Sequence, residues 1–351
     1  MQRTLSPVCL ALALGILSAS CSQDATTPTD PPISADRQGD GNNAPVTYAV
    51  IGDVPYGAAA LTSFPTLIGA INGDPAVRRV IHVGDIKSGT TLCSDAWFNS
   101  IATDFTTFTD PLVYAIGDNE WTDCHRLNNG GYNPLERLAK VRELFFANPG
   151  FTLGGQQVKI KAEDNYPENQ RWMTSDVVFS VLHIIGSNNG RAPWFGDRAS
   201  PVGETPAETA AREAEWSARD AADLRWLERT FQQAKEEHAK GVVLFFQADM
   251  WHPDDRAAGA SFTAFTGFVQ RLAQLAIAFR RPVLLVAGDS HDYRVDVGVP
   301  WFSLYGVTPP TNITQVIVDR SIEDDIDYLR LKIDPKSAAV FSWEQVFVPV
   351  I

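Results

Sequence analysis

Short apolar runs alternate along the chain with longer stretches that repeat apolar positions every three or four residues. The first three runs each close on Gly-Asp: VTYAVIGD (46–53), RRVIHVGD (78–85) and LVYAIGDN (112–119). Helix-length segments separate them, Ala58–Asn72 and Ser94–Phe108, and a further helical pattern that starts with Pro occupies 134–146. Strands that alternate with helices predict βαβ units and a parallel sheet.

The second half of the chain continues this pattern and then changes. An apolar run with a polar end, VVFSVLHIIGSNNG (177–190), precedes a long amphipathic helix, Thr205–Lys240. Two more apolar runs, 241–253 and 281–294, flank a helix at about 261–280. The tail has short β-rich segments separated by Pro, Asn and Asp, so we expect consecutive antiparallel strands at 300–307, 314–319, 327–334 and 338–346.

The first 45 residues do not fit this pattern. Arg3 and the apolar run Val8–Leu17 are typical of a signal peptide, and the run is too short to cross a bilayer. Cys21 follows small residues and resembles the lipidated cysteine of bacterial lipoproteins; an ordinary secretory signal with an incidental cysteine is the alternative. We expect a signal peptide at 1–20, a disordered tether at 21–45 and one folded domain at 46–351. The expected location is the periplasm or outer membrane of a bacterium, with membrane contact only through the lipid.

Composition and charge exclude one class of partner. The 351 residues are 44% hydrophobic, enough for a substantial core, and the net charge is −13 with no basic run. Phosphate backbones recruit clusters of Lys and Arg, so nucleic acid is not an expected partner. The composition leaves the oligomeric state open.

Two cysteines, Cys93 and Cys124, remain for the folded domain once Cys9 and Cys21 are assigned to the N-terminal segment. In an oxidising compartment such a pair is expected to form a disulfide. A reactive thiol at Cys124, next to His125, is the alternative and would make the chain a thiol redox protein.

Residues of types that can bind metals follow five of the apolar runs. They are Asp53, Asp85, Asp118-Asn119-Glu120, Gln247 with Asp249, and Asp289 with His291. In an α/β fold the active site forms outside the carboxyl ends of the strands, so these side chains are expected to converge. Converging carboxylates repel one another and require a cation, and carboxylates with one imidazole suit Mg²⁺, Mn²⁺, Ca²⁺, Zn²⁺ or Fe.

In order and spacing, this series resembles the motifs of the calcineurin-like metallophosphoesterase superfamily, which run D-x-H, G-D-x-x-D, G-N-H-[DE], H and G-H-x-H. The resemblance covers about residues 46–345. It implies an α/β fold that is a four-layer α-β-β-α sandwich with mixed sheets, in which the strand-rich tail forms the second sheet. It also implies two divalent ions bridged by Asp85, and hydrolysis of a phosphoester by water that the metal activates.

The resemblance distributes the ligands between the two ions. Asp53 and His291 are expected on one ion, and Asp118, Gln247 and Asp289 around the other. Asp249 and His252 are alternatives to Gln247 after a small shift in register.

The chain departs from the family pattern mainly in its histidines. Pro55 replaces the histidine of the first motif, so Asp53 stands alone there unless Tyr56 helps it, and Asp289 replaces the first histidine of the last motif. Oxygen ligands in place of imidazoles shift the metal preference towards Mg²⁺, Mn²⁺ or Ca²⁺. Asn119 takes the position of the catalytic histidine, so the missing acid is sought at His125, His252 or Glu120.

Candidate substrate-binding residues also lie near polar strand ends. Asn188 and Asn189 end the run at 177–190, and Arg126 follows the third motif, where a guanidinium can hold a phosphate with two hydrogen bonds. Turn formation explains the asparagines equally well, and a surface arginine needs no ligand. His82 and His183, inside apolar runs, are interpreted as core histidines.

The sequence therefore predicts an exported hydrolase that acts on small phosphomonoesters or phosphodiesters with divalent metal ions. The alternative is a binding or envelope lipoprotein of the same fold whose altered motifs no longer support turnover.

Overall fold

The apolar runs form two mixed β-sheets in the computed structural model, which describes residues 43–320 and 326–349. All described residues belong to one compact unit. The predicted signal peptide, Cys21 and nearly all of the predicted tether lie outside the described residues. Within the described part, no helix is long and apolar enough to span a membrane.

The first sheet has the strand order β12-β11-β1-β2-β3. Its strands are β1 (Val46–Ile51), β2 (Val77–His82), β3 (Leu112–Tyr114), β11 (Ile326–Ile333) and β12 (Phe341–Val348). β1, β2 and β3 are parallel, as the Gly-Asp runs predict. β11 is antiparallel to β1, with Val46 opposite Ile333, and β12 is antiparallel to β11.

The second sheet has the order β4-β5-β6-β7-β8-β10-β9. Its strands are β4 (Lys161–Ala162), β5 (Gln170–Thr174), β6 (Val177–Val181), β7 (Gly241–Phe245), β8 (Val283–Ala287), β9 (Arg294–Val297) and β10 (Ile313–Ile317). β6, β7, β8 and β10 are parallel to one another, and antiparallel strands flank them on both sides.

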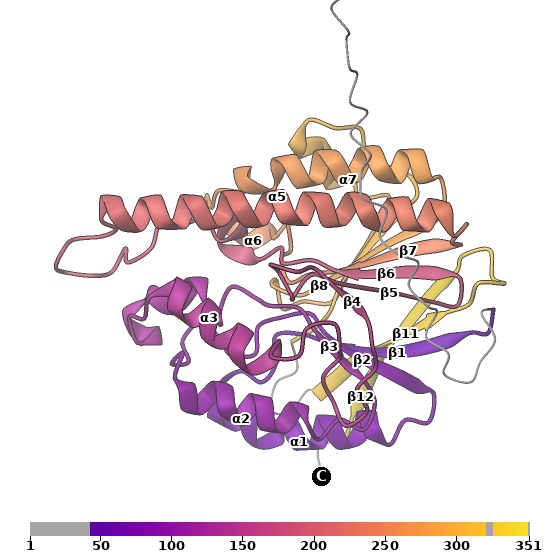
Figure 1. Cartoon of the computed structure of the whole chain (residues 1–351), viewed down its shortest axis with the longest axis horizontal. Coiled ribbons are helices and arrows are strands. Elements are labelled where there is room, and N and C mark those ends of the chain that lie inside the picture. Colours follow the sequence, from indigo (N-terminus) through magenta and orange to yellow (C-terminus); the bar gives the residue numbers. More distant parts are fainter. Residues whose placement is uncertain (1–42, 321–325, 350–351) are drawn as a thin grey trace, which may run out of the picture. The chain divides into compact units, whose positions relative to one another are not determined.

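Helices cover the outer face of each sheet (Figure 1). The first sheet carries α1 (Gly57–Asn72), α2 (Asp95–Phe105) and α3 (Pro134–Phe145), and the second carries α5 (Pro206–Glu236) and α7 (Thr266–Phe279). The shorter helical segments are α4 (Gly186–Asn189), α6 (Pro253–Ala257) and the 3₁₀ turns η1 (Thr122–His125), η2 (Leu127–Asn129), η3 (Thr263–Phe265) and η4 (Pro300–Tyr305). The expected four-layer α-β-β-α sandwich with mixed sheets is confirmed.

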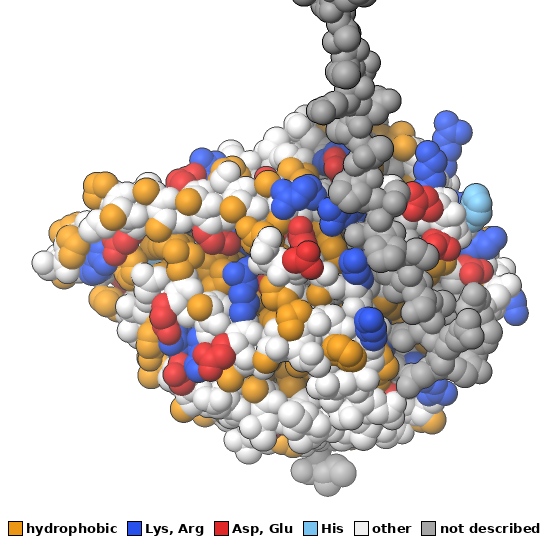
Figure 2. Space-filling view, in the orientation of Figure 1, with side chains coloured by type: hydrophobic (Ala, Val, Ile, Leu, Met, Phe, Trp, Pro, Cys, Tyr) orange, Lys and Arg blue, Asp and Glu red, His pale blue; other side chains and the backbone are white. Residues whose placement is uncertain are grey.

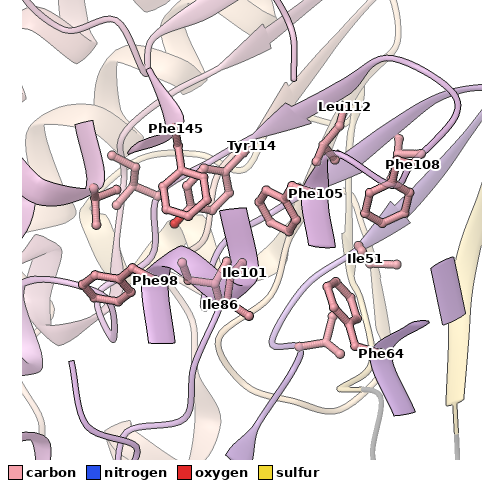
Figure 3. Close-up of a cluster of buried hydrophobic side chains, with 14 of the residues drawn as sticks. Ile51, Phe64, Ile86, Phe98, Ile101, Phe105, Phe108, Leu112, Tyr114 and Phe145 are labelled. Carbon is pink, nitrogen blue, oxygen red and sulfur yellow. The ribbon is translucent and has the colours of Figure 1, made fainter. Parts of the chain in front are cut away.

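The strands read as continuous apolar runs because both faces of each sheet are buried. In β7, Val242 and Leu244 pack under the helices, whereas Val243 and Phe245 face the other sheet. Figure 3 shows the cluster between the first sheet and its helices, where Phe105 packs against both Phe64 and Tyr114. These layers hold the residues that follow β1, β2, β3, β7 and β8 in fixed relative positions.

The helices start where local sequence supplies capping groups. Asn133 caps α3 with its side chain and Pro134 occupies the first turn. Thr205 and Glu208 form a capping box at the start of α5, the helix predicted at Thr205–Lys240.

Two expectations for the tail were wrong. Residues 300–307 are not a strand: they contain η4, because the buried Trp301, Phe302 and Tyr305 recur at the spacing of a helical turn rather than in alternation. The tail also does not form the second sheet as a unit. β10 joins that sheet parallel to β8, with Ile313 opposite Val283, while β11 and β12 extend the first sheet.

Candidate metal centre

Acidic and amide side chains from five strand ends meet at one edge of the two packed sheets. They are Asp53 after β1, Asp85 after β2, Asp118 and Asn119 after β3, Gln247 after β7, and Asp289 with His291 after β8. The hydrogen bonds described below join them into one network. Asp53, Asp85, Asp118, Asn119 and Gln247 are less than one-tenth exposed, whereas Asp289 and His291 are partly exposed.

One part of the network consists of Asp53, Asp85 and His291, each of which offers a ligand atom within 4.8 Å of the others. His291 Nε2 lies 3.5 Å from Asp53 Oδ1. The hydroxyl of Tyr56 lies between them, 3.0 Å from Asp53 Oδ1, 2.9 Å from Asp85 Oδ2 and 3.2 Å from His291 Nε2. Four lone-pair donors from three strand ends therefore surround one point.

The other part consists of Asp118 and Asp289, joined to Asp85 by the carboxamide of Gln247. Gln247 Nε2 donates to Asp289 Oδ1 at 3.0 Å and to Asp118 Oδ1 and Asp85 Oδ2 at 3.3 Å. The backbone N–H of Asp249 donates to the other oxygen of Asp289, and Ser187 Oγ donates to the other oxygen of Asp118.

Glycines let these carboxylates approach neighbouring backbone. A Cβ on Gly186 would lie 2.6 Å from Asp118 Oδ2 and 2.9 Å from Asp289 Oδ1. A Cβ on Gly117 would overlap Asp85, and one on Gly288 would overlap Asp53. Gly117 and Gly288, each the Gly of a Gly-Asp run, are thus packing requirements of the centre.

Burial and mutual repulsion give these carboxylates a strong need for a proton or a cation. Burial raises the pKa of Asp53 to about 7, against the hydrogen bonds from Tyr56 and the Asp289 backbone. Burial, with the charges of neighbouring carboxylates, raises the pKa of Asp85 and Asp289 well above their usual values. Burial, with the charge of Arg320, lowers the pKa of His291 to about 4, so its imidazole is neutral and able to bind a metal.

Two further buried groups support the strand end after β3. Glu120 Oε1 accepts from the Gly117 N–H and the Tyr114 hydroxyl, both at 2.6 Å. The Lys87 ammonium donates to the carbonyl oxygens of Asn119 and Ser88 at 2.7 and 2.8 Å, and burial lowers its pKa to about 8. Lys87 thereby places a positive charge beside the acidic network.

The loop between β8 and β9, which carries Asp289 and His291, is held by Asp249. This carboxylate is fully buried, and it accepts hydrogen bonds from Ser290 at 2.8 Å and from Arg294 at 2.7 Å. It also accepts from the side chain of Gln315 on β10. Of the three alternatives at the fourth motif, Gln247 therefore contacts the other carboxylates directly, and Asp249 anchors the adjacent loop.

The predicted Cys93–Cys124 disulfide is confirmed, so Cys124 is not a free thiol in this structure. Both sulfur atoms lie 3.5 Å from the carbonyl oxygen of Asn119. Asn119 in turn donates from Nδ2 to Asp85 Oδ2 at 2.7 Å and to the Tyr56 hydroxyl at 3.3 Å. The disulfide thus fixes the backbone from which Asn119 reaches the centre.

Five other predicted site residues have partners away from these carboxylates. His125 accepts the Phe195 N–H at Nδ1, and His252 caps α6 by accepting the Asp255 N–H. Asn188 accepts the Ala264 N–H, and Asn189 is buried with its Oδ1 bound to Arg219. Arg126, partly exposed, pairs with Asp123 at 2.7 Å. His82 and His183 are fully buried and hydrogen-bonded, as core histidines are expected to be.

Sequence reasoning did not select Lys87 or Ser187 and treated Tyr56 only as a helper of Asp53. The sequence signal for Tyr56 is its position: a tyrosine three residues after a strand-end aspartate lies in the same turn and can contact that aspartate. Ser187 had none, because it reaches Asp118 through left-handed backbone at Ser187 and Asn188.

No protein-family model and no curated protein matches the chain. Two solved structures align with 87% of it. One is a purple acid phosphatase from yellow lupin (Lupinus luteus) seeds, at 9% identity and a TM-score of 0.45; the alignment spans 54% of that chain, about half its length. The other is GAP50, the anchor in the inner membrane complex of Plasmodium, at 11% identity and a TM-score of 0.42, with 90% of that chain covered. The chemistry of the centre rests on the residues above and not on these alignments.

Proposed function

We propose that this chain is an exported phosphoester hydrolase that depends on a divalent metal ion. The observation that carries the proposal is the convergence of Asp53, Asp85 and His291, whose ligand atoms lie within 4.8 Å of one another. They follow three strands of two different sheets, in an order that resembles the motifs of phosphoester-cleaving metalloenzymes.

The residues fit a hard divalent cation. Two carboxylate oxygens, a neutral imidazole and a phenol oxygen form a donor set suited to Mg²⁺ or Mn²⁺. When bound, such an ion lowers the pKa of a coordinated water and balances the charge of a phosphate. It also relieves the repulsion among the buried carboxylates.

Asn119 and Arg126 are assigned to substrate positioning. A Cβ added to Gly89 would lie 3.2 Å from Asn119 Oδ1 and 3.5 Å from Arg126 Nη1, so the amide and the guanidinium border the same space. A guanidinium holds two phosphate oxygens with parallel hydrogen bonds. Arg126 therefore binds the phosphoryl group, while Asn119 orients Asp85.

The position that would protonate the leaving group holds an amide. Asn119 has no proton to transfer, and His125 is neutral with Nδ1 engaged by Phe195, because burial and the charge of Arg126 lower its pKa to about 4. Substrates whose leaving group departs without protonation, such as aryl phosphates, are therefore the proposed class.

Export is supported by two features. Residues 1–21 have the pattern of a lipoprotein signal, and the disulfide between Cys93 and Cys124 suits an oxidising compartment. Labelling of the full chain with a fatty acid, lost in Cys21→Ala, tests the lipid anchor.

The activity is tested on the purified full chain with p-nitrophenyl phosphate and bis(p-nitrophenyl) phosphate, in the presence of Mg²⁺, Mn²⁺, Ca²⁺, Zn²⁺ or Fe²⁺ in turn. Asp85→Asn should lower metal-dependent hydrolysis by at least about 100-fold. The matched control is Asp164→Asn, an exposed aspartate, which should retain the wild-type rate.

One observation favours a second candidate, a binding protein without turnover: Asn119 stands where the family has its catalytic histidine. That protein would still be stabilised against heat by a divalent metal, but the substrate panel would stay silent with every ion. Metal-dependent melting together with absent hydrolysis would therefore replace the hydrolase with the binding protein.

A further inference from the structure

The carboxamide of Gln247 lies at the position where the family resemblance expects a second metal ion. Its Nε2 is surrounded by carboxylate oxygens of Asp85, Asp118 and Asp289 at 3.0 to 3.3 Å. The amide nitrogen carries two protons and no available lone pair. It neutralises part of the repulsion by donating hydrogen bonds, and it cannot bind a cation.

The orientation of this amide is set by the backbone opposite it. The Gly186 N–H donates to Gln247 Oε1 at 2.6 Å. Rotating the amide to turn Oε1 towards the carboxylates would place its NH₂ group against this N–H. A buried N–H left without an acceptor costs about 1–3 kcal/mol. The aliphatic part of Gln247 is also confined, because it packs directly against Gly84.

The other carboxylate oxygens of Asp118 and Asp289 accept hydrogen bonds from other donors of the chain. Asp289 Oδ2 accepts the Asp249 N–H at 2.9 Å, and Asp118 Oδ2 accepts from Ser187 at 2.9 Å. The Lys87 ammonium beside Asn119 adds a fixed positive charge nearby. Hydrogen-bond donors of the chain thus occupy positions around these carboxylates that a second ion would need.

The position between Asp53, Asp85 and His291 differs from that of the Gln247 amide, because its central contacts are made by a group that can bind a metal. The group that contacts all three residues there is the Tyr56 hydroxyl, whose oxygen has lone pairs and can itself bind a metal. The Asn119 amide donates to that oxygen and to Asp85 Oδ2, and the Asp289 N–H donates to Asp53, so an ion here would use the remaining lone pairs of these oxygens and the imidazole of His291.

We infer that the centre holds a single divalent ion, bound by Asp53, Asp85 and His291, and that the Gln247 carboxamide replaces the second ion. This inference rests on the proposed function for the first ion. It departs from the pair of ions that the resemblance implies.

The test is metal stoichiometry, measured without reference to activity. The full chain is stripped with a chelator, titrated with MnCl₂ by calorimetry, and analysed for bound manganese and by electron paramagnetic resonance. The wild type should bind one Mn²⁺ with the spectrum of an isolated ion. Gln247→Glu, which replaces the NH₂ group by an oxygen of similar size, should bind two and show the spectrum of a coupled pair.

Two control variants separate the positions. Asp53→Asn should lose the single ion. Gln345→Glu makes the same chemical change at another glutamine that donates to a carboxylate, that of Asp327 in β11, and should still bind one ion. Melting curves establish that each variant is folded; if Gln247→Glu does not fold, the wild-type stoichiometry decides.

Two ions or a coupled pair in the wild type would overturn the inference and leave the proposed hydrolase standing. One ion in a folded Gln247→Glu would also overturn it, because Gln247 would then not be the group that excludes the second ion. No bound ion in the wild type would overturn both the inference and the metal-dependent function.

Discussion

At the scale of single residues, the centre depends on glycines that have no room for a methyl group. Gly288 precedes Asp289 and lies against the carboxylate of Asp53, and Gly117 lies against that of Asp85. Each is the Gly of a Gly-Asp run at a strand end. A side chain there displaces a metal ligand without changing the charge of the site.

Gly288→Ala should therefore weaken Mn²⁺ binding by at least about 10-fold, in the range seen when a group supporting a metal ligand is lost. Gly69→Ala is the control: Gly69 lies within α1, and nothing would be within 4 Å of its Cβ. The control should leave binding unchanged and stabilise the helix by about 0.5–1 kcal/mol. Calorimetric titration and thermal melting measure the two effects; equal binding by both variants would contradict the role of Gly288.

In the proposed hydrolase, Asn119 at the position of the general acid would limit which substrates are cleaved. A general acid contributes about 10²–10⁴-fold to rate, and an amide supplies none of this. The kcat/KM for a series of aryl phosphates should fall steeply as the leaving group becomes more basic, and alkyl phosphates should be poor substrates. A flat dependence across the series would mean that another group of the chain donates the proton.

At the scale of elements, the loop between β8 and β9 is positioned by a partly buried ion pair. Arg294, the first residue of β9, binds Asp249 at 2.7 Å and Asp296 at 3.0 Å. Asp249 is fully buried, whereas the side chain of Asp296 is 18% exposed. The two carboxylates share one arginine in different surroundings, and only Asp249 also binds Ser290.

Asp249→Asn should lower the free energy of unfolding by about 1–3 kcal/mol and also weaken metal binding, because Asp289 and His291 lie on the released loop. Asp296→Asn, which loses the more exposed partner of the same arginine, should cost less than about 1 kcal/mol and leave metal binding intact. Chemical denaturation and metal titration of both variants provide the comparison. Equal effects would show that the loop does not depend on Asp249.

The disulfide joins two elements of the first half of the fold. Cys93 lies just before α2 and Cys124 lies in η1, 31 residues apart in sequence. Closing a loop of that length stabilises the folded state by roughly 3–4 kcal/mol in the chain-entropy description. Cys93→Ser combined with Cys124→Ser should lower the denaturation midpoint accordingly. A midpoint equal to that of the wild type would show that the disulfide does not stabilise the folded state.

At the scale of the whole molecule, charge is unevenly divided between surface and interior. The chain has a net charge of −13, and on the face in Figure 2 basic side chains are interspersed with acidic and hydrophobic ones. An acidic molecule of this kind repels polyanions at long range. The interior carries its own buried carboxylates, and these link folding to pH.

Asp223, buried in α5 and away from the metal centre, shows this link. Burial raises its pKa to about 8, against the charge of Arg219 and a hydrogen bond from Asn169, whereas the unfolded value is 3.8. Between these two pKa values the folded state holds a proton that the unfolded state releases. This contribution to stability is therefore fully present below pH 3.8 and is lost as the pH rises to about 8. Asp223→Asn should reduce the fall in stability between about pH 5 and pH 7 by up to about 1.4 kcal/mol per pH unit, measured by denaturation. An unchanged slope would contradict the assignment.

Much of this architecture was predictable because local patterns report burial. The runs at 46–53, 78–85 and 112–119 are apolar on both faces, and both faces are indeed covered. Asp53, Asp85, Asp289 and His291 were selected because a polar residue directly after a buried strand lies at the edge of the sheet. The disulfide followed from the cysteines left over for the domain.

The remainder depended on contacts between residues far apart in sequence. By itself, the sequence determined which segments are buried strands and which polar residues end them, because those properties are local. Only the tertiary structure decided that β10 joins one sheet and β11 the other, that residues 300–307 contain a helical turn, and that Gln247 turns its NH₂ group to three carboxylates. The reason is physical: a strand's neighbours depend on pairing across the whole chain, and an amide's orientation depends on an opposing backbone N–H, here that of Gly186, 61 residues away.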